Sequence, residues 1–159
     1  MDENITRADL ERFAHLLGAR IEKPADVFLV GGAALLFLGS GRATEDVDYV
    51  GNDLSDNENI LQRHIDDLAR ETKLNIEAVA FSFFVPALSD SAARHRLIGR
   101  FGLIQLWVFD PVAIALSKLD RGFETDLQDV TFLLATNIIE LDQVRLSLLE
   151  ISPLAHNLA

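Results

Sequence analysis

The sequence predicts an α/β (α+β) fold, in which a small mixed sheet is flanked by helices and followed by a helical C-terminal part. Two observations lead to this class. Short apolar runs with strand composition alternate with amphipathic stretches of helical period up to about residue 109, and capped helical patterns follow. The 159 residues, of which 49% are hydrophobic, are enough for one sizeable core. We therefore expect a single domain over residues 1–159.

The N-terminal part contains a first helix and two strands. Residues 6–9 form a cap motif for the helix. Its apolar stripe consists of Leu10, Phe13, Ala14 and Leu17. Residues 27–30 are all apolar and begin and end with a β-branched valine, which is typical of a buried strand. Two glycines follow, then a short helix is expected over 33–38 and a second strand over 46–50.

The remainder of the chain is predicted to be mainly helical. A helix is expected from about residue 56, with an inward face made of Ile60, Leu61, Ile65, Leu68 and Ala69. Residues 79–85 and 103–109 have strand composition. Asp110-Pro111 begins a helix that ends at Gly122. Later helices over 125–151, the last with Val144, Leu148 and Leu149 inward, are expected to close a cleft on a core of about 26–134.

Two aspartates lie two residues apart in the expected second strand. Residues with this spacing share one face of a strand, so Asp46 and Asp48 project together while Val47 and Tyr49 face the other way. Neighbouring carboxylates repel each other unless a cation lies between them, and oxygen ligands suit Mg²⁺ or Mn²⁺. The pair therefore predicts a divalent-metal site.

The turn before the short helix contains Gly31 and Gly32. Glycine lets the backbone turn tightly or lie close to a ligand. The first N–H groups of the following helix have no intrahelical partner, which suits a phosphate. The turn and the two aspartates together predict a phosphate cradle that faces a metal site.

The order of strand, glycine pair and Asp-x-Asp resembles the nucleotidyltransferase superfamily that includes DNA polymerase β. The run from Arg42 to Asp48 (Arg-x-Thr-x-Asp-x-Asp) is similar to a small bacterial branch with AbiEii-type toxins. The resemblance covers about 27–134 and implies a nucleotidyltransferase-like fold, an NTP substrate and Mg²⁺ or Mn²⁺ as cofactor. The nucleotide-binding residues that it implies in this region are Gly31, Gly32, Ser40, Arg42 and Thr44.

A second motif pairs Lys118-x-x-Arg121 with Asp126-x-x-Asp129. The small bacterial branch carries Lys and Arg on one helix and Asp-x-x-Asp at the start of the next. By that resemblance, Lys118 and Arg121 contact nucleotide phosphates, and Lys118 reaches the cleft beside Asp46. Asp129 lies behind the metal site or activates the acceptor. Ordinary helix-end preferences explain the same residues, because cations are favoured late in a helix and acids early, and this alternative stays open.

Polymerase-type members of the superfamily use a third carboxylate on a neighbouring strand. The sequence does not assign that residue, although Glu77 is a candidate that could lie in a strand, a helix or a loop. The expected catalytic residues are Asp46, Asp48, Lys118 and Asp129, with Asp46 and Asp48 as metal ligands.

The net charge of the chain limits which acceptor molecules it can bind. The chain has 14 Lys and Arg against 25 Asp and Glu, a formal net charge of −11. Proteins that bind extended nucleic acid neutralise its phosphates and are normally basic, so we expect a protein or small-molecule acceptor. The local excess of positive charge at Arg94, Arg96 and Arg100 suits a few phosphates at an RNA terminus. A partner protein is another source of positive charge.

The absence of cysteine and of a secretory signal predicts a cytoplasmic protein, and no apolar run is long enough to span a membrane.

The predicted function is transfer of a nucleoside monophosphate from an NTP to an acceptor, in a toxin–antitoxin or phage-defence setting. The alternative is a nucleotidyltransferase-like protein with weak turnover that acts as a binding partner, for instance an antitoxin component. The unassigned third acid favours the alternative, whereas the two charged motifs favour the enzyme.

Overall fold

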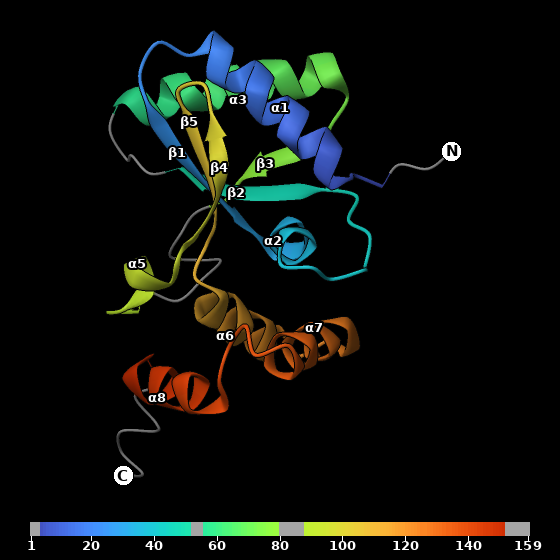
Figure 1. Cartoon of the computed structure of the whole chain (residues 1–159), viewed down its shortest axis with the longest axis vertical. Coiled ribbons are helices and arrows are strands. Elements are labelled where there is room, and N and C mark those ends of the chain that lie inside the picture. The colour runs from blue at the N-terminus through green and yellow to red at the C-terminus, as the bar shows by residue number, and fades with distance from the viewer. Residues whose placement is uncertain (1–3, 52–55, 80–87, 152–159) are drawn as a thin grey trace. The chain divides into compact units, whose positions relative to one another are not determined.

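The computed structural model describes residues 4–51, 56–79 and 88–151, and confirms the predicted α/β class (Figure 1). The chain forms two compact units, which are described separately below. The first comprises Met1–Val79 with Arg96–Val108, and the second comprises Ala80–His95 with Phe109–Ala159. The chain therefore passes between the units three times, after Val79, after His95 and after Val108.

The first unit is built on a five-stranded mixed sheet with the order β3-β2-β1-β5-β4. Its strands are β1 (Ala25–Val30), β2 (Val47–Gly51), β3 (Ile76–Ala78), β4 (Arg96–Phe101) and β5 (Ile104–Val108). Strand β2 is antiparallel to β1 and parallel to β3. The C-terminal end of β1 and the N-terminal ends of β2 and β3 therefore lie at the same edge of the sheet.

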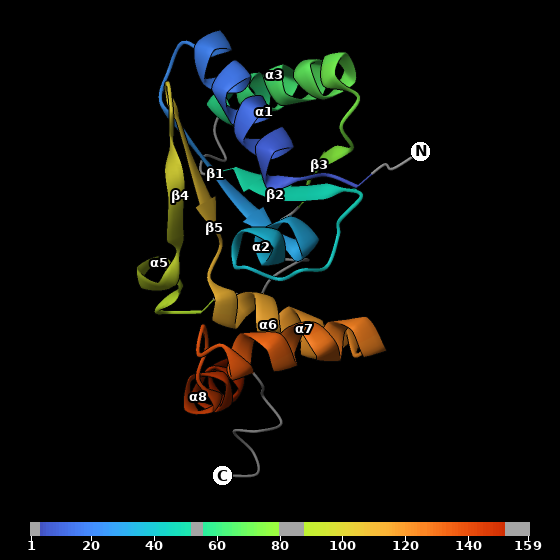
Figure 2. The same ribbon diagram turned by 45° about the vertical axis from the view of Figure 1, so that its right-hand side comes forward.

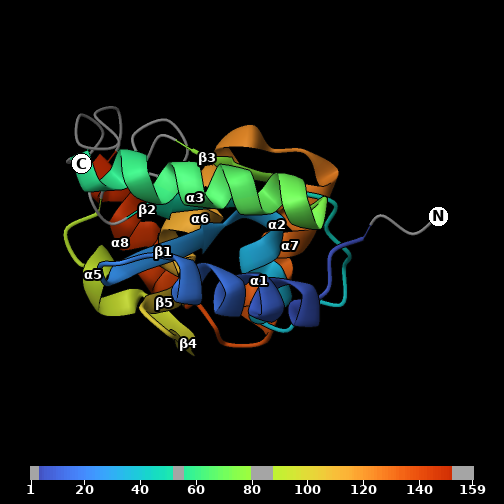
Figure 3. The same cartoon turned by 90° about the horizontal axis from the view of Figure 1, so that it is seen from above.

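Two helices cover one face of this sheet. Helices α1 (Arg7–Arg20) and α3 (Asp56–Thr72) lie side by side, as Figure 3 shows from above. The predicted cap of α1 is confirmed, because Thr6 and Asp9 exchange side-chain-to-backbone hydrogen bonds of 2.9 and 3.1 Å. Two hydrogen bonds from Arg20 to Glu71, of 3.2 and 2.7 Å, join the two helices at the surface.

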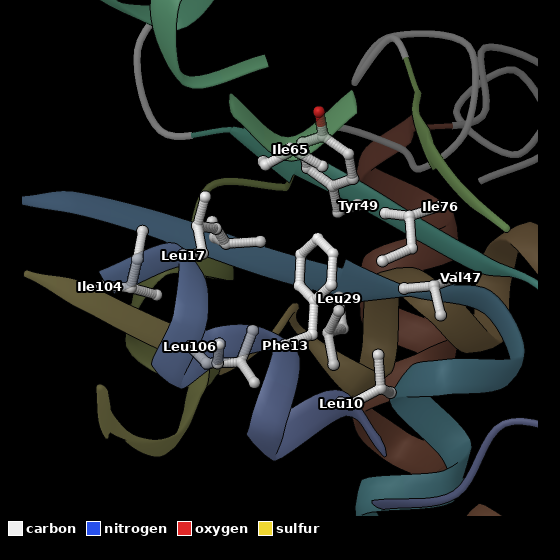
Figure 4. Close-up of a pocket in the computed structure, with 12 residues that line it drawn as sticks. Leu10, Phe13, Leu17, Leu29, Val47, Tyr49, Ile65, Ile76, Ile104 and Leu106 are labelled. Carbon is white, nitrogen blue, oxygen red and sulfur yellow. The ribbon is translucent and has the colours of Figure 1, made fainter. Parts of the chain in front are cut away.

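The core of the first unit lies between these helices and the sheet, around an apolar cavity of about 30 Å³ (Figure 4). Side chains from both helices and from all strands except β4 line it, including Phe13 of α1, Leu29 of β1 and Ile65 of α3. Val47 and Tyr49 of β2 also face it and are 1% and 3% exposed. The predicted alternation along β2 is thus confirmed, and Asp48 projects from the opposite face.

A short helix directly continues strand β1. Helix α2 (Gly31–Phe37) follows β1 directly (Figure 2). It begins at the first of the two glycines and buries Ala33, Ala34 and Leu35. Gly31 has φ of 63°, a left-handed conformation that favours glycine. The predicted strand–glycine–helix unit is therefore present.

The second unit consists of helices in its described part: α5 (Ser91–Arg94), α6 (Pro111–Arg121), α7 (Glu124–Ala135) and α8 (Leu141–Ile151). Helix α6 is its centre and packs against both α7 and α8 (Figure 2). The predicted ends of α6 are confirmed, because the Asp110 side chain caps its start and Gly122 ends it with φ of 71°. Among the described helices, none combines the length and the apolar character needed to cross a bilayer.

Some predicted details differ from the structure. Ile60 is 53% exposed, since it lies about 100° around the helix from buried Leu61. Leu148 and Leu149 were expected to face inward but are 47% and 39% exposed. The strand predicted over 79–85 falls almost entirely on residues outside the described ranges.

Candidate functional site

Strand pairing brings three of the sequence features to one edge of the sheet in the first unit. Val30, the residue before Gly31, pairs with Asp48 across β1 and β2. On the other side of β2, Asp48 pairs with Glu77 of β3. The last residue before the glycine turn, the second aspartate and Glu77 therefore lie on three consecutive strands at the same level of the sheet.

The side chains of Asp48 and Glu77 share one face of the sheet. Directly paired residues on neighbouring strands project to the same side, and the neighbours of this pair, Val47 and Ile76, line the core on the other side. Asp46 is exposed and lies one residue before β2, so the strand begins one residue later than the sequence predicted. Asp48 is half-buried and Glu77 is exposed. Asp48 and Glu77 thus share one face of the sheet, and Asp46 directly precedes β2 at the same edge.

The structure places Glu77 in a strand, a choice that the sequence left open. The sequence pattern for a strand is weak here, because β3 has only three residues, Ile76–Ala78, and only Ile76 among them is typical of strands. The structure and register of this segment are set by its pairing with β2, which is distant in the sequence and so cannot be read from the local pattern.

The segment between α2 and β2 holds the glycine turn in place. Thr44 is 7% exposed, and its hydroxyl donates a hydrogen bond of 2.8 Å to the carbonyl of Asp46. A Cβ atom at Gly32 would lie 2.7 Å from that hydroxyl oxygen, which explains why glycine is needed there. Ser40 accepts a hydrogen bond of 3.2 Å from the Arg42 amide, and the Arg42 side chain is exposed. The structure gives Thr44 a structural role, and the nucleotide contacts of Ser40, Arg42 and Thr44 stay predictions.

The carboxylate edge fits a divalent cation by its donor chemistry. Asp46, Asp48 and Glu77 offer only oxygen ligands, the type that Mg²⁺ and Mn²⁺ prefer. Within the described residues, no three acidic, histidine or cysteine side chains already converge on one point as a preformed metal cluster. Metal binding would therefore draw the carboxylates together from their present orientations.

The second predicted motif forms a buried ion cluster in the second unit. The Nζ atom of Lys118 lies 2.8 Å from Asp129 Oδ2 and 3.7 Å from Asp126 Oδ1. The side chains of Lys118 and Asp129 are each only 5% exposed. Ordinary helix-end preferences explain why a cation lies late in α6 and acids lie early in α7. They do not explain why the side chains of Lys118 and Asp129 are both buried, because charges that cap a helix are usually solvated. The cluster connects α6 to the first two turns of α7.

Asp126 holds the turn between these helices. It accepts a hydrogen bond of 2.6 Å from Arg121 and one of 3.3 Å from the Phe123 amide. The hydrogen bond from Arg121 is the main reason why the pKa of Asp126 is lowered, with further contributions from the charges of Arg121 and Lys118. Arg121 itself is about half exposed. Asp126 therefore serves as a helix cap and as a counter-ion for two cations.

A further buried cluster joins the end of the first segment of the second unit to the start of its second segment, and the sequence did not reveal it. Asp110 is 0% exposed and accepts two hydrogen bonds of 2.8 Å from Arg94 and one of 2.9 Å from Ser91. Its amide donates to His95 Nδ1 at 3.0 Å. Arg94, which the sequence suggested for phosphate binding, is thus engaged by Asp110. Its pKa is raised mainly by that hydrogen bond.

The structure therefore gathers the predicted residues into two groups. Gly31, Gly32, Asp46 and Asp48 come together in the first unit, with Glu77 as an addition. The members of the second group are Lys118, Arg121, Asp126 and Asp129. The approach of Lys118 to Asp46 stays a prediction.

Comparison with known families agrees with this geometry. A family model described as "Nucleotidyltransferase of unknown function (DUF6036)" matches residues 8–156. Searches of curated proteins and of solved structures returned no match. The family match spans both units and all the residues of the two groups, so the chain belongs to this family of nucleotidyltransferases of unknown function.

Proposed function

We propose that the protein is a metal-dependent enzyme that transfers a nucleoside monophosphate from an NTP to an acceptor. One observation carries the proposal: Val30, Asp48 and Glu77 pair in succession across β1, β2 and β3. This register puts a carboxylate pair beside the glycine turn, and we propose Glu77 as the third acid that the sequence left unassigned. It supports a nucleotidyltransferase centre of the polymerase β type.

The chemistry needs few groups from the protein. An oxygen of the acceptor attacks the α-phosphorus, a new P–O bond forms, and the bond to pyrophosphate breaks while the acceptor proton passes to a base. Asp46, Asp48 and Glu77 would hold Mg²⁺ or Mn²⁺, which when bound neutralises negative charge on phosphate oxygens. The backbone at Gly31 and Gly32 would position the triphosphate, since no described side chain caps the start of α2 at Val30.

Arg42 and Lys118 are the cations that we assign to the nucleotide. Arg42 is exposed on the segment that precedes Asp46. Lys118 is bound by Asp129 at 2.8 Å, so a phosphate oxygen would have to replace that carboxylate as the partner of Nζ. The released Asp129 carboxylate would then be available to accept the acceptor proton. Asp129 is therefore our candidate for the base.

The acceptor is proposed from charge. A net charge of −11 disfavours extended nucleic acid, so we assign a protein or small-molecule acceptor. The toxin–antitoxin or phage-defence setting is proposed from the resemblance to AbiEii-type toxins. The alternative, a binding partner or antitoxin component with weak turnover, was favoured mainly by the missing third acid. We take Glu77, which pairs with Asp48 in the sheet, as the candidate for that acid, and this supports the enzyme over the alternative.

A transfer assay tests the proposal. The protein is incubated with each α-³²P-labelled NTP, Mg²⁺ and total cell extract, and the products are separated into protein, RNA and small molecules. We expect label from one or two NTPs in protein or small molecules, and none with Asp48→Asn. Glu22→Gln, an exposed acid before β1, is the matched control and should transfer as wild type does. Equal labelling by wild type and Asp48→Asn would refute the proposed centre, and strong labelling of tRNA would refute the proposed acceptor.

A further inference from the structure

The sheet of the first unit carries a row of apolar side chains on the face from which Asp48 projects. Its members, in the order of strands β4, β5, β1 and β2, are Leu97, Trp107, Phe28 and Val50, each paired directly with the next. Val50 lies two residues after Asp48 in β2, and residues two apart in a strand share a face. The row is therefore continuous across four strands and lies beside the carboxylates.

Phe28 and Trp107 form an aromatic pair at the centre of this row. Their ring centroids lie 6.0 Å apart with an interplanar angle of 22°, so the two rings make one continuous aromatic surface. The indole N–H of Trp107 donates a hydrogen bond of 2.9 Å to Asp26 Oδ1, which fixes the orientation of that ring. Both aromatic residues are half-buried, so part of the surface that they form remains exposed.

Packing in the core of the first unit does not account for the aromatic pair. Leu29 and Leu106, the neighbours of these rings along β1 and β5, point into the apolar cavity (Figure 4). Phe28 and Trp107 alternate with them and therefore project from the opposite face of the sheet. A cross-strand aromatic pair stabilises a sheet by itself, a role that does not depend on any ligand. A role in binding therefore has to be argued from what lies beside the pair.

The spacing between the aromatic pair and Asp48 fits one nucleotide. Asp48 pairs with Val30, so Phe28 lies one strand across from it and two residues along, and Trp107 lies one strand further. Strands are about 4.8 Å apart and residues about 3.4 Å apart along a strand, which puts the backbones of Phe28 and Trp107 roughly 8 and 12 Å from that of Asp48. A mononucleotide covers this range between its phosphates and its base.

We propose that Phe28 and Trp107 hold the base of the NTP by stacking, while its phosphates lie at the glycine turn and the carboxylates. The inference rests on the proposed function, because it takes the ligand of this sheet face to be an NTP. It extends the assigned contacts from the phosphates to the base. Stacking of a base on an aromatic side chain raises affinity about fivefold or more.

Trp107 is the single tryptophan of the chain, so its fluorescence reports directly on this surface. The full chain is titrated in Mg²⁺ with ATP, GTP, CTP and UTP in turn, and with tripolyphosphate, which has no base. Fluorescence follows the indole, and calorimetry measures the affinity. The variants are Phe28→Leu, Trp107→Leu and the conservative Trp107→Phe. The matched control is Phe101→Leu, a half-buried aromatic residue of β4 that pairs with Ile104 and contacts His15 of α1 on the other face.

We expect at least one NTP to quench the fluorescence of Trp107 in wild type and in Phe101→Leu, and tripolyphosphate to bind without quenching. Phe28→Leu and Trp107→Leu should weaken binding of that NTP about fivefold or more. Their affinity for tripolyphosphate should stay within about twofold of wild type, which also shows that these variants are folded. Trp107→Phe should keep most of the affinity for the NTP, because an aromatic ring remains.

Mg²⁺-dependent NTP binding without quenching, or with wild-type affinity in both leucine variants, would overturn the inference and leave the proposed function intact. Quenching by a short single-stranded RNA but by no NTP would also overturn it, because the base would then belong to an acceptor. Quenching by an NTP that persists in EDTA and in Asp48→Asn would support the aromatic site and contradict the metal centre. Absence of binding by every NTP would overturn both proposals.

Discussion

The acidic residues of the two units differ in their surroundings. In the first unit, Asp46 and Glu77 are exposed and Asp48 is half-buried, at one edge of the sheet. In the second unit, Asp110, Asp126 and Asp129 are at most 4% exposed and lie against Arg94, Arg121 and Lys118. Removing one member of a buried ion pair strongly destabilises a fold, whereas solvent-facing acids gathered at one edge add little stability and remain accessible to a ligand. The same residue type thus supports structure in one unit and, in our proposal, chemistry in the other.

The largest effect on stability is expected from Asp129→Ala. The change leaves the buried Lys118 ammonium with Asp126 alone, 3.7 Å away and already shared with Arg121. Breaking a buried pair in this way costs about 3–5 kcal/mol of unfolding free energy. Urea unfolding measures the loss. Asp142→Ala, which removes the exposed partner of Arg145, is the control and should cost less than about 1 kcal/mol.

A paired replacement sharpens this test. Lys118→Met combined with Asp129→Leu removes both buried charges, so most of the lost stability should return. If the cluster also has the proposed catalytic role, the double variant should fold but fail in the transfer assay. Full transfer by the double variant would show that the cluster is structural only.

A smaller loss is expected at the Asp110 cluster. Asp110→Ala removes the cap of α6 and leaves Arg94, whose side chain is 20% exposed, without its bidentate partner. We expect a loss of about 2–4 kcal/mol in urea unfolding, from the cap and the broken pair together. Asp9→Ala, which removes part of the exposed cap of α1, should cost only about 1 kcal/mol. Equal losses in the two variants would contradict the difference between buried and exposed acids.

The smallest effect is a pH dependence at His95. Burial lowers the pKa of His95, Arg94 lowers it further, and Asp110 opposes the change. The unfolded chain therefore binds the proton first as the pH falls through 6.5, and this contribution to stability declines until the folded His95 is also protonated. His95→Asn keeps a hydrogen-bond acceptor for the Asp110 amide but does not titrate. Subtracting its stability–pH curve from that of wild type should reveal the decline, and parallel curves between pH 5 and 8 would contradict it.

Local patterns were enough to predict much of the first unit. Residues 27–50 give the strand, the glycine turn and the second strand in order, because each depends on near neighbours in sequence. Glu77 could not be placed in the same way, since a three-residue strand has little pattern of its own and is fixed by pairing with β2. The Asp110 cluster was missed for a related reason, because its contacts join residues 15 to 19 positions apart.

Helical periodicity also has a limit in the second unit. It predicts which residues share a face of a helix but not whether that face is buried. Leu148 and Leu149 were therefore predicted to be buried, whereas the structure exposes them to solvent. Asp129 illustrates the reverse case. A charged residue early in a helix was compatible with a solvated cap, yet it is 4% exposed because Lys118 reaches it from the preceding helix.

Isothermal titration calorimetry of NTP binding tests the central claim most directly. Wild type is titrated with each NTP in Mg²⁺ and again in EDTA, alongside Asp48→Asn, Glu77→Gln and the control Glu22→Gln. We predict binding of at least one NTP in Mg²⁺ that weakens about tenfold or more in EDTA and in the Asp48 and Glu77 variants, with unchanged unfolding midpoints. Equal affinity with and without Mg²⁺, or wild-type affinity in Asp48→Asn, would contradict the assignment of this sheet edge as the metal and nucleotide site.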